Sequence, residues 1–195
     1  MLKKSTVWLQ SIQHGFIATL PVVMLGALAL TFVQMANWFL SSETAGASQV
    51  LGQVVQQACY GVMAIILVLS ISHKLASYYH QRYLLNFDPL IVAILAMVTL
   101  VAMTHLDHGA DFFNNLGVTA IGKGLLCAIV YTELYVFFYR NRFLKLSYLT
   151  GVIDSTLLTA MRSIWPALLA SIIFLFVYLL ISKPLEHLGF WLPAF

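Results

Sequence analysis

Two ionisable side chains, Lys123 and Glu133, lie inside one apolar stretch of the sequence, residues 116–139. A charge at the centre of a lipid bilayer costs at least ~2.5 kcal/mol, so such residues are candidates for contact with a polar ligand. They are ten positions apart, which on a helix separates them by about 15 Å and places them on different faces. Lys123 and Glu133 therefore cannot pair with each other on one helix.

Each of these residues also has a structural interpretation, which we weigh above ligand contact. Glu133 shares a helix face with Arg140 and is a candidate for a bond to a polar group on a neighbouring helix. Lys123, between Gly122 and Gly124, can extend outward until its ammonium group reaches the membrane surface.

A second group of chemically capable residues lies between 104 and 111, where His105, Asp107, His108 and Asp111 could offer imidazole and carboxylate ligands to a metal ion. No further cluster in the sequence completes such a site, so we interpret the segment as a solvated loop. The sequence contains no glycine-rich phosphate loop, and no pairing of a Ser or Cys nucleophile with a His can be identified in it. It therefore predicts no enzyme, no cofactor and no metal site.

The elements that carry these residues are apolar segments long enough, or nearly long enough, to cross a bilayer. They are residues 15–40, 54–72, 89–103, 116–139 and 166–181. Charged residues make up 9% of the chain and apolar residues 61%, against roughly 25% and 45–50% in a soluble domain. We predict an all-α integral membrane protein, a single membrane domain over residues 1–195, with about five transmembrane helices. Val7, Trp8, Ile12 and Phe16 recur at helical spacing before the first span and predict a short interfacial amphipathic helix.

Lys and Arg residues are concentrated before the first apolar segment and after the second and the fourth, at Lys3, Lys4, Lys74, Arg82, Arg140, Arg142, Lys145 and Arg162. The segments after the first and the third, 41–53 and 104–115, contain none. This alternation predicts a multi-pass membrane protein with its N-terminus in the cytoplasm and its C-terminus outside. We interpret the basic residues as topology signals near anionic lipid and not as a nucleic-acid surface.

Three stretches of the sequence resemble the membrane-embedded permease subunit (EIIC) of bacterial phosphotransferase sugar systems, of the lactose/cellobiose type. Residues 9–21, followed by Gly26, are similar to that family's amphipathic lead-in and first helix, with His14 where an Asp is usual. Residues 116–135 are similar to its fourth helix, which ends in Glu-aliphatic-Tyr. Residues 155–166 are similar to the entry into its fifth helix, although leucines replace the usual prolines at 157 and 158.

The resemblance covers only the N-terminal half of the family's fold. It implies a homodimer scaffold in the lipid bilayer and structural roles for Glu133 and Arg162. The family's sugar-binding residues lie in the other half, so none can be transferred to this chain. We therefore expect a half-length permease domain of a bacterial inner membrane, either one part of a split transporter or a remnant or truncated product of one, that does not transport alone. Its expected partners are sugar, a separate second half and soluble phosphotransferase components.

Two alternatives remain open at the level of sequence. One is a sensory or anchoring domain of a bacterial signalling protein, for example a cyclic-di-GMP enzyme. The other is a scaffold that dimerises with a complete permease. The odd number of predicted spans argues against a cytoplasmic output domain fused after Phe195, because that end would face outward.

Overall fold

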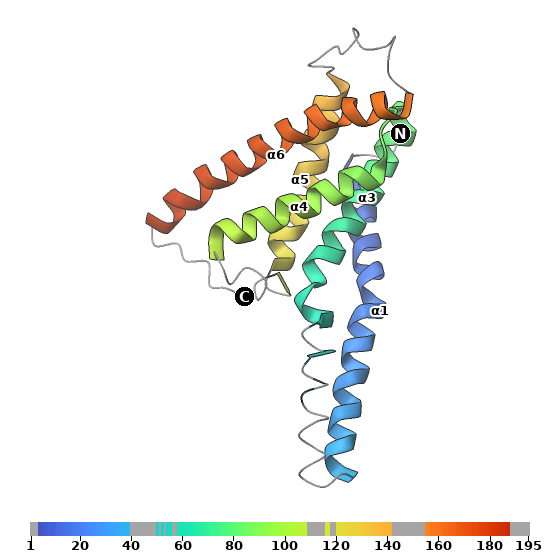
Figure 1. Ribbon diagram of the computed structural model, residues 1–195, viewed down its shortest axis with the longest axis vertical. Helices are drawn as coiled ribbons and strands as arrows, with labels where there is room; N and C mark the ends of the chain where they lie inside the picture. Colours follow the sequence, from blue (N-terminus) through green and yellow to red (C-terminus); the bar gives the residue numbers. More distant parts are fainter. Residues whose placement is uncertain are drawn as a thin grey trace.

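The computed structural model describes residues 4–39, 58–108, 120–141 and 155–187, together with 50, 52, 54, 55, 116 and 117. The long elements in these residues are the helices α1 (Lys4–Phe39), α3 (Met63–Tyr83), α4 (Pro89–His108), α5 (Ile121–Arg140) and α6 (Ser155–His187). They run alternately in opposite directions (Figure 1). The described residues contain no β-strand, so the predicted all-α class is confirmed.

Four of these helices are long and apolar enough to cross a membrane, through Ser5–Met35, Pro89–Leu106, Ile121–Arg140 and Ser163–Leu180. The second predicted span, 54–72, overlaps α3 only from Met63, and part of its beginning lies outside the described residues. α3 then continues to Tyr83 through His73, Lys74 and Arg82. Those polar residues explain why α3 is not among the four most apolar helices.

α1 differs from the prediction in its continuity. The sequence suggested a separate interfacial helix followed by a first span, whereas the structure has one helix of 36 residues, about 54 Å long. The helix continues through Pro21. This length exceeds a hydrocarbon core of about 30 Å, so α1 must tilt or extend beyond the core.

Small residues bring α1 close to α3. Val7, Ser11, Gly15 and Thr19 are buried at every fourth position, which forms one face of the helix. A Cβ on Gly15 would lie 2.3 Å from Ile71 Cγ1, so only glycine permits this approach. In lipid, close packing of this kind is a main source of helix association. The lead-in therefore packs against protein along this face, and α1 continues from it without a break.

α3 is the central helix, since it contacts α1, α4 and α5. Its core side chains are fully buried: Ala64, Leu67, Val68, Ile71, Leu75 and Ala76. Gly124 of α5 packs against α3, where a Cβ would lie 3.0 Å from Val68 Cγ2. α6 contacts α5 and α4, and its outward face exposes large apolar side chains such as Phe176. Exposed apolar faces of this kind suit contact with lipid.

The turn between α3 and α4 lies at the end of the bundle that holds Arg82 and Arg140. Leu84 closes α3 in the left-handed conformation, with φ 49°. Asp88 begins α4 as its cap, because its Oδ1 accepts a 2.9 Å bond from the Leu90 amide and Pro89 follows at the first helical position. Phe87 is buried beneath this turn, and the Tyr139 hydroxyl of α5 donates a 2.5 Å bond to the Asn86 carbonyl.

Candidate functional site

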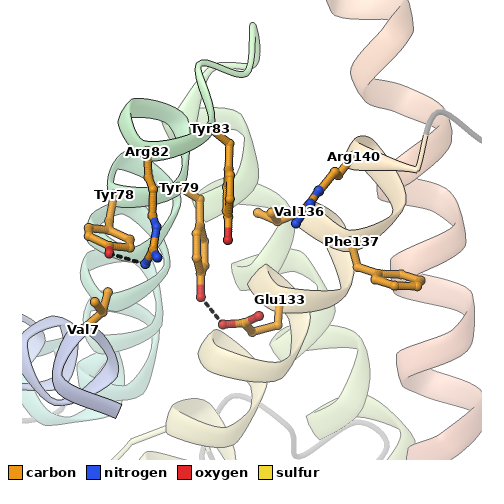
Figure 2. A pocket seen from close by; sticks show the side chains of 9 residues that line it. All are labelled: Val7, Tyr78, Tyr79, Arg82, Tyr83, Glu133, Val136, Phe137 and Arg140. Carbon is orange, nitrogen blue, oxygen red and sulfur yellow. Dashed lines mark hydrogen bonds between the residues drawn. The ribbon is translucent and has the colours of Figure 1, made fainter. Parts of the chain in front are cut away.

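Glu133 joins three helices at one end of the bundle. Trp8 Nε1 of α1 donates a 2.8 Å hydrogen bond to Glu133 Oε1, and the Tyr79 hydroxyl of α3 donates a second bond to the same oxygen (Figure 2). Trp8 lies near the beginning of α1, whereas Tyr79 and Glu133 lie toward the C-terminal ends of α3 and α5. The bonds that the sequence analysis suggested for Glu133 thus reach two neighbouring helices.

A cavity of about 270 Å³ opens beside Glu133. Its lining combines tyrosines, two arginines and apolar side chains: Val7, Tyr78, Tyr79, Arg82, Tyr83, Glu133, Val136, Phe137 and Arg140. Figure 2 shows Tyr83 between the two arginine side chains, and Glu133 is less exposed than either arginine. The site is therefore a polar cavity between helices, with a carboxylate inside and two cations nearer its edge.

Tyrosine rings hold both arginines. Arg82 Nη1 donates a 2.6 Å bond to the Tyr78 hydroxyl oxygen. Its Cζ also lies 5.8 Å from the Tyr83 ring centroid, and Arg140 Cζ lies 5.1 Å from the same centroid. These distances lie in the range of cation–π attraction. Tyr83 in turn stacks on Tyr79, at 5.9 Å between ring centroids.

Tyr79 is the neutral donor of this cluster. It lies beyond Ser72, where the predicted second span ends, and only 4% of it is exposed. Burial, followed by the hydrogen bond to the Glu133 carboxylate, raises the pKa of the Tyr79 hydroxyl above its ordinary value. The Tyr79 hydroxyl therefore keeps its proton and donates a hydrogen bond to Glu133.

The other predicted candidates lie elsewhere or are only partly described. Lys123 is in the first turn of α5, at the opposite end of the helix from Glu133, so the structure does not bring the two together. Arg162 is on α6, and its side chain lies outside the described residues.

The loop weighed as a metal site is described only in part. His105 is exposed near the end of α4, while Asp111 and the side chains of Asp107 and His108 lie outside the described residues. Within the described part of the chain, no group of three His, Cys, Asp or Glu residues could hold a metal ion.

Sequence reasoning did not find the partners of Glu133. Trp8 was assigned to an interfacial face and Arg82 to membrane topology. A signal was present in the spacing, since Tyr79 and Tyr83 are four positions apart on one helix face. Their contact with α5, however, depends on how two helices are rotated relative to each other.

The fold and the cavity define a multi-pass, all-helical membrane domain. No family model matches the sequence, and no curated protein matches it. The structure is similar to the crystal structure of the transporter ChbC, the IIC component from the N,N'-diacetylchitobiose-specific phosphotransferase system, with a TM-score of 0.66 and 21% sequence identity. At this identity the likeness shows the fold, and the expected resemblance to an EIIC permease is confirmed at that level.

The two proteins differ in length. The likeness covers 94% of this chain and 44% of the ChbC chain. The chain therefore spans less than half the length of the transporter that it resembles.

Proposed function

We propose that this chain is the membrane domain, or part of the membrane domain, of an EIIC-type sugar permease. The observation that carries the proposal is the likeness to ChbC over 94% of the chain. It supports the permease interpretation and not the sensory or anchoring alternatives. The proposed substrate class is a sugar, with disaccharides such as N,N'-diacetylchitobiose as the first to test.

The second part of the proposal is that residues 1–195 do not transport sugar alone. It is supported by the 44% coverage of ChbC. Transport would require the remaining part of the permease fold, whether on the same polypeptide or on another. A second copy of the domain and the soluble phosphotransferase components complete the proposed assembly.

The third part concerns orientation. The ends of α1, α3 and α5 that meet at Glu133 adjoin the basic residues Lys4, Arg82 and Arg140. The positive-inside rule places such an end in the cytoplasm. Reporter fusions at residue 141, after α5, test this directly, because they should be active only with a cytoplasmic reporter.

The proposed activity is tested with membrane vesicles from native cells and from cells lacking the gene. The vesicles receive labelled N,N'-diacetylchitobiose or related disaccharides, the soluble phosphotransferase proteins and their phosphoryl donor. We expect sugar phosphorylation and uptake to be lost with the gene. We also expect residues 1–195, expressed alone in the deletion strain, to reach the membrane without restoring uptake.

The outcomes separate the parts of the proposal. Equal uptake in both vesicle types, over the full set of sugars, would contradict the permease function. Restoration by residues 1–195 alone would confirm a permease and contradict the need for a further part. Immunoblotting of the membrane fraction verifies that the expressed chain is present in the vesicles.

A further inference from the structure

Two arginines from different helices, Arg82 of α3 and Arg140 of α5, meet beside Tyr83 at the cavity edge. The Tyr83 ring lies 5.8 Å from Arg82 Cζ and 5.1 Å from Arg140 Cζ, so the two guanidinium groups lie at most about 11 Å apart. Neither forms an ion pair with any residue that the structure describes. Salt largely screens the repulsion between exposed charges at this separation, so both guanidinium groups remain available to an anion.

The hydrogen-bonding capacity of these arginines fits a phosphate group. A guanidinium carries five N–H donors in a planar fork that matches two phosphate oxygens. Arg82 uses Nη1 for the Tyr78 hydroxyl and retains further donors. Both guanidinium groups lie within cation–π distance of the Tyr83 ring, which leaves their N–H donors available to an anion.

The position of the cavity indicates a lipid as the source of that phosphate. Arg82 and Arg140 lie at the ends of α3 and α5, among tyrosines of the kind that gather at headgroup depth. Val136 and Phe137 line the same cavity, and Phe137 is 55% exposed. A phosphate group beside exposed apolar surface is the chemistry of a phospholipid.

Glu133 reduces the net positive charge of the cavity lining and so favours an anion with a single negative charge. Two arginines and one carboxylate line it, which leaves one net positive charge. The carboxylate is less exposed than the arginines and already accepts bonds from Trp8 and Tyr79, so an anion is favoured near the arginines and not beside Glu133. A phosphodiester carries one negative charge and matches this arrangement.

We propose that Arg82 and Arg140 bind the phosphodiester of an anionic phospholipid, of the phosphatidylglycerol type, at the edge of this cavity. The site goes beyond sugar transport and does not depend on it. Basic pockets between membrane helices are a known form of lipid recognition, and here the lipid would fill the cavity between α3 and α5 and hold their ends together.

Native mass spectrometry of the detergent-solubilised protein tests the proposal by measuring the affinity of the first bound lipid. The probes are dioleoylphosphatidylglycerol and dioleoylphosphatidylcholine, because the latter has the same chains and no net charge. We expect Arg82→Gln and Arg140→Gln each to lower the affinity for phosphatidylglycerol about fivefold and to lower that for phosphatidylcholine less, because its choline ammonium offsets the charge of the same phosphodiester. The matched control is Lys74→Gln, which removes an exposed charge from α3 outside the cavity and should change neither affinity.

Three results would overturn the proposal. The first is equal affinity of the parent protein for the two lipids. The second is an equal loss in Lys74→Gln, which would indicate a diffuse surface effect. The third is displacement of phosphatidylglycerol by millimolar inorganic phosphate, which would assign the site to free phosphate. Both arginines are exposed, so their variants should fold, and an unchanged circular dichroism spectrum verifies that they do.

Discussion

Replacing Glu133 by methionine should destabilise the domain through the two donors that it leaves behind. Methionine has a similar length and no strong acceptor, so Trp8 Nε1 and the Tyr79 hydroxyl would both lose their partner. A buried donor without an acceptor costs about 1–3 kcal/mol, whereas hydrogen bonds between membrane helices average about 0.6 kcal/mol and reach about 1.7 kcal/mol. Trp8 is only half-buried and can turn toward water. We therefore expect a loss of about 1–3 kcal/mol, most of it from the Tyr79 hydroxyl.

The same reasoning makes a sharper prediction for the triple variant Trp8→Phe/Tyr79→Phe/Glu133→Met. Removing both donors together with Glu133 leaves neither of these two hydrogen bonds without its acceptor, although Trp8→Phe also removes one ring of a half-buried indole. The triple variant should therefore regain part of the stability that Glu133→Met loses.

The assay is the free energy of unfolding in mixed micelles, measured by titration with dodecyl sulfate and followed by circular dichroism. A matched control combines Glu133→Met with Trp165→Phe, since Trp165 is a half-exposed indole on α6. That pair should show additive losses. The reasoning is refuted if the triple variant loses at least as much stability as Glu133→Met alone, because the bonds would then not be the source of the effect.

Three further predictions use the same assay. Gly15→Ala should cost about 1–3 kcal/mol through overpacking against Ile71, whereas Gly61→Ala, with open space around it, should cost nothing; equal costs would contradict the close contact of α1 with α3. Asp88→Ala should cost about 0.5–2 kcal/mol as a lost helix cap, and Asp88→Asn should retain most of that stability. Leu84→Gly should stabilise by up to about 1 kcal/mol, because the left-handed conformation strains a leucine; a loss would show that its side chain makes a needed contact.

Hydropathy and charge placement predicted much of this architecture. Apolar length identifies a membrane helix without knowledge of its neighbours, and the regions of α4, α5 and α6 were found in that way. Lys and Arg on alternate loops indicated that the beginning of α1 and the ends of α3 and α5 lie on one side, and the bonds from Trp8 and Tyr79 to Glu133 join those three ends. Glu133 was also recognised, because a carboxylate in an apolar segment is costly without partners.

The partners themselves could not be predicted, because they depend on the rotation of each helix. An aromatic residue near a span end has the same sequence signature whether it faces lipid or a carboxylate. The side chains of Trp8 and Tyr79 point toward Glu133 of another helix, whereas the side chain of Trp38 is exposed. The prediction of a break before the first span was wrong for a related reason. Whether a helix bends at the membrane surface depends on which residues of other helices its buried face contacts.

The register of α1 shows how packing and polar bonding specify one arrangement together. In lipid, apolar contact does not by itself favour protein over acyl chains, and α1 has its main helix contact with α3. The buried positions Val7, Ser11 and Gly15 fix the face that meets α3. Trp8 follows Val7 by one residue, about 100° around the helix, and so reaches past α3 to Glu133 of α5. Turning α1 to another face would bring a side chain larger than glycine against Ile71 and remove the indole from the carboxylate, so the two interactions select the same rotation.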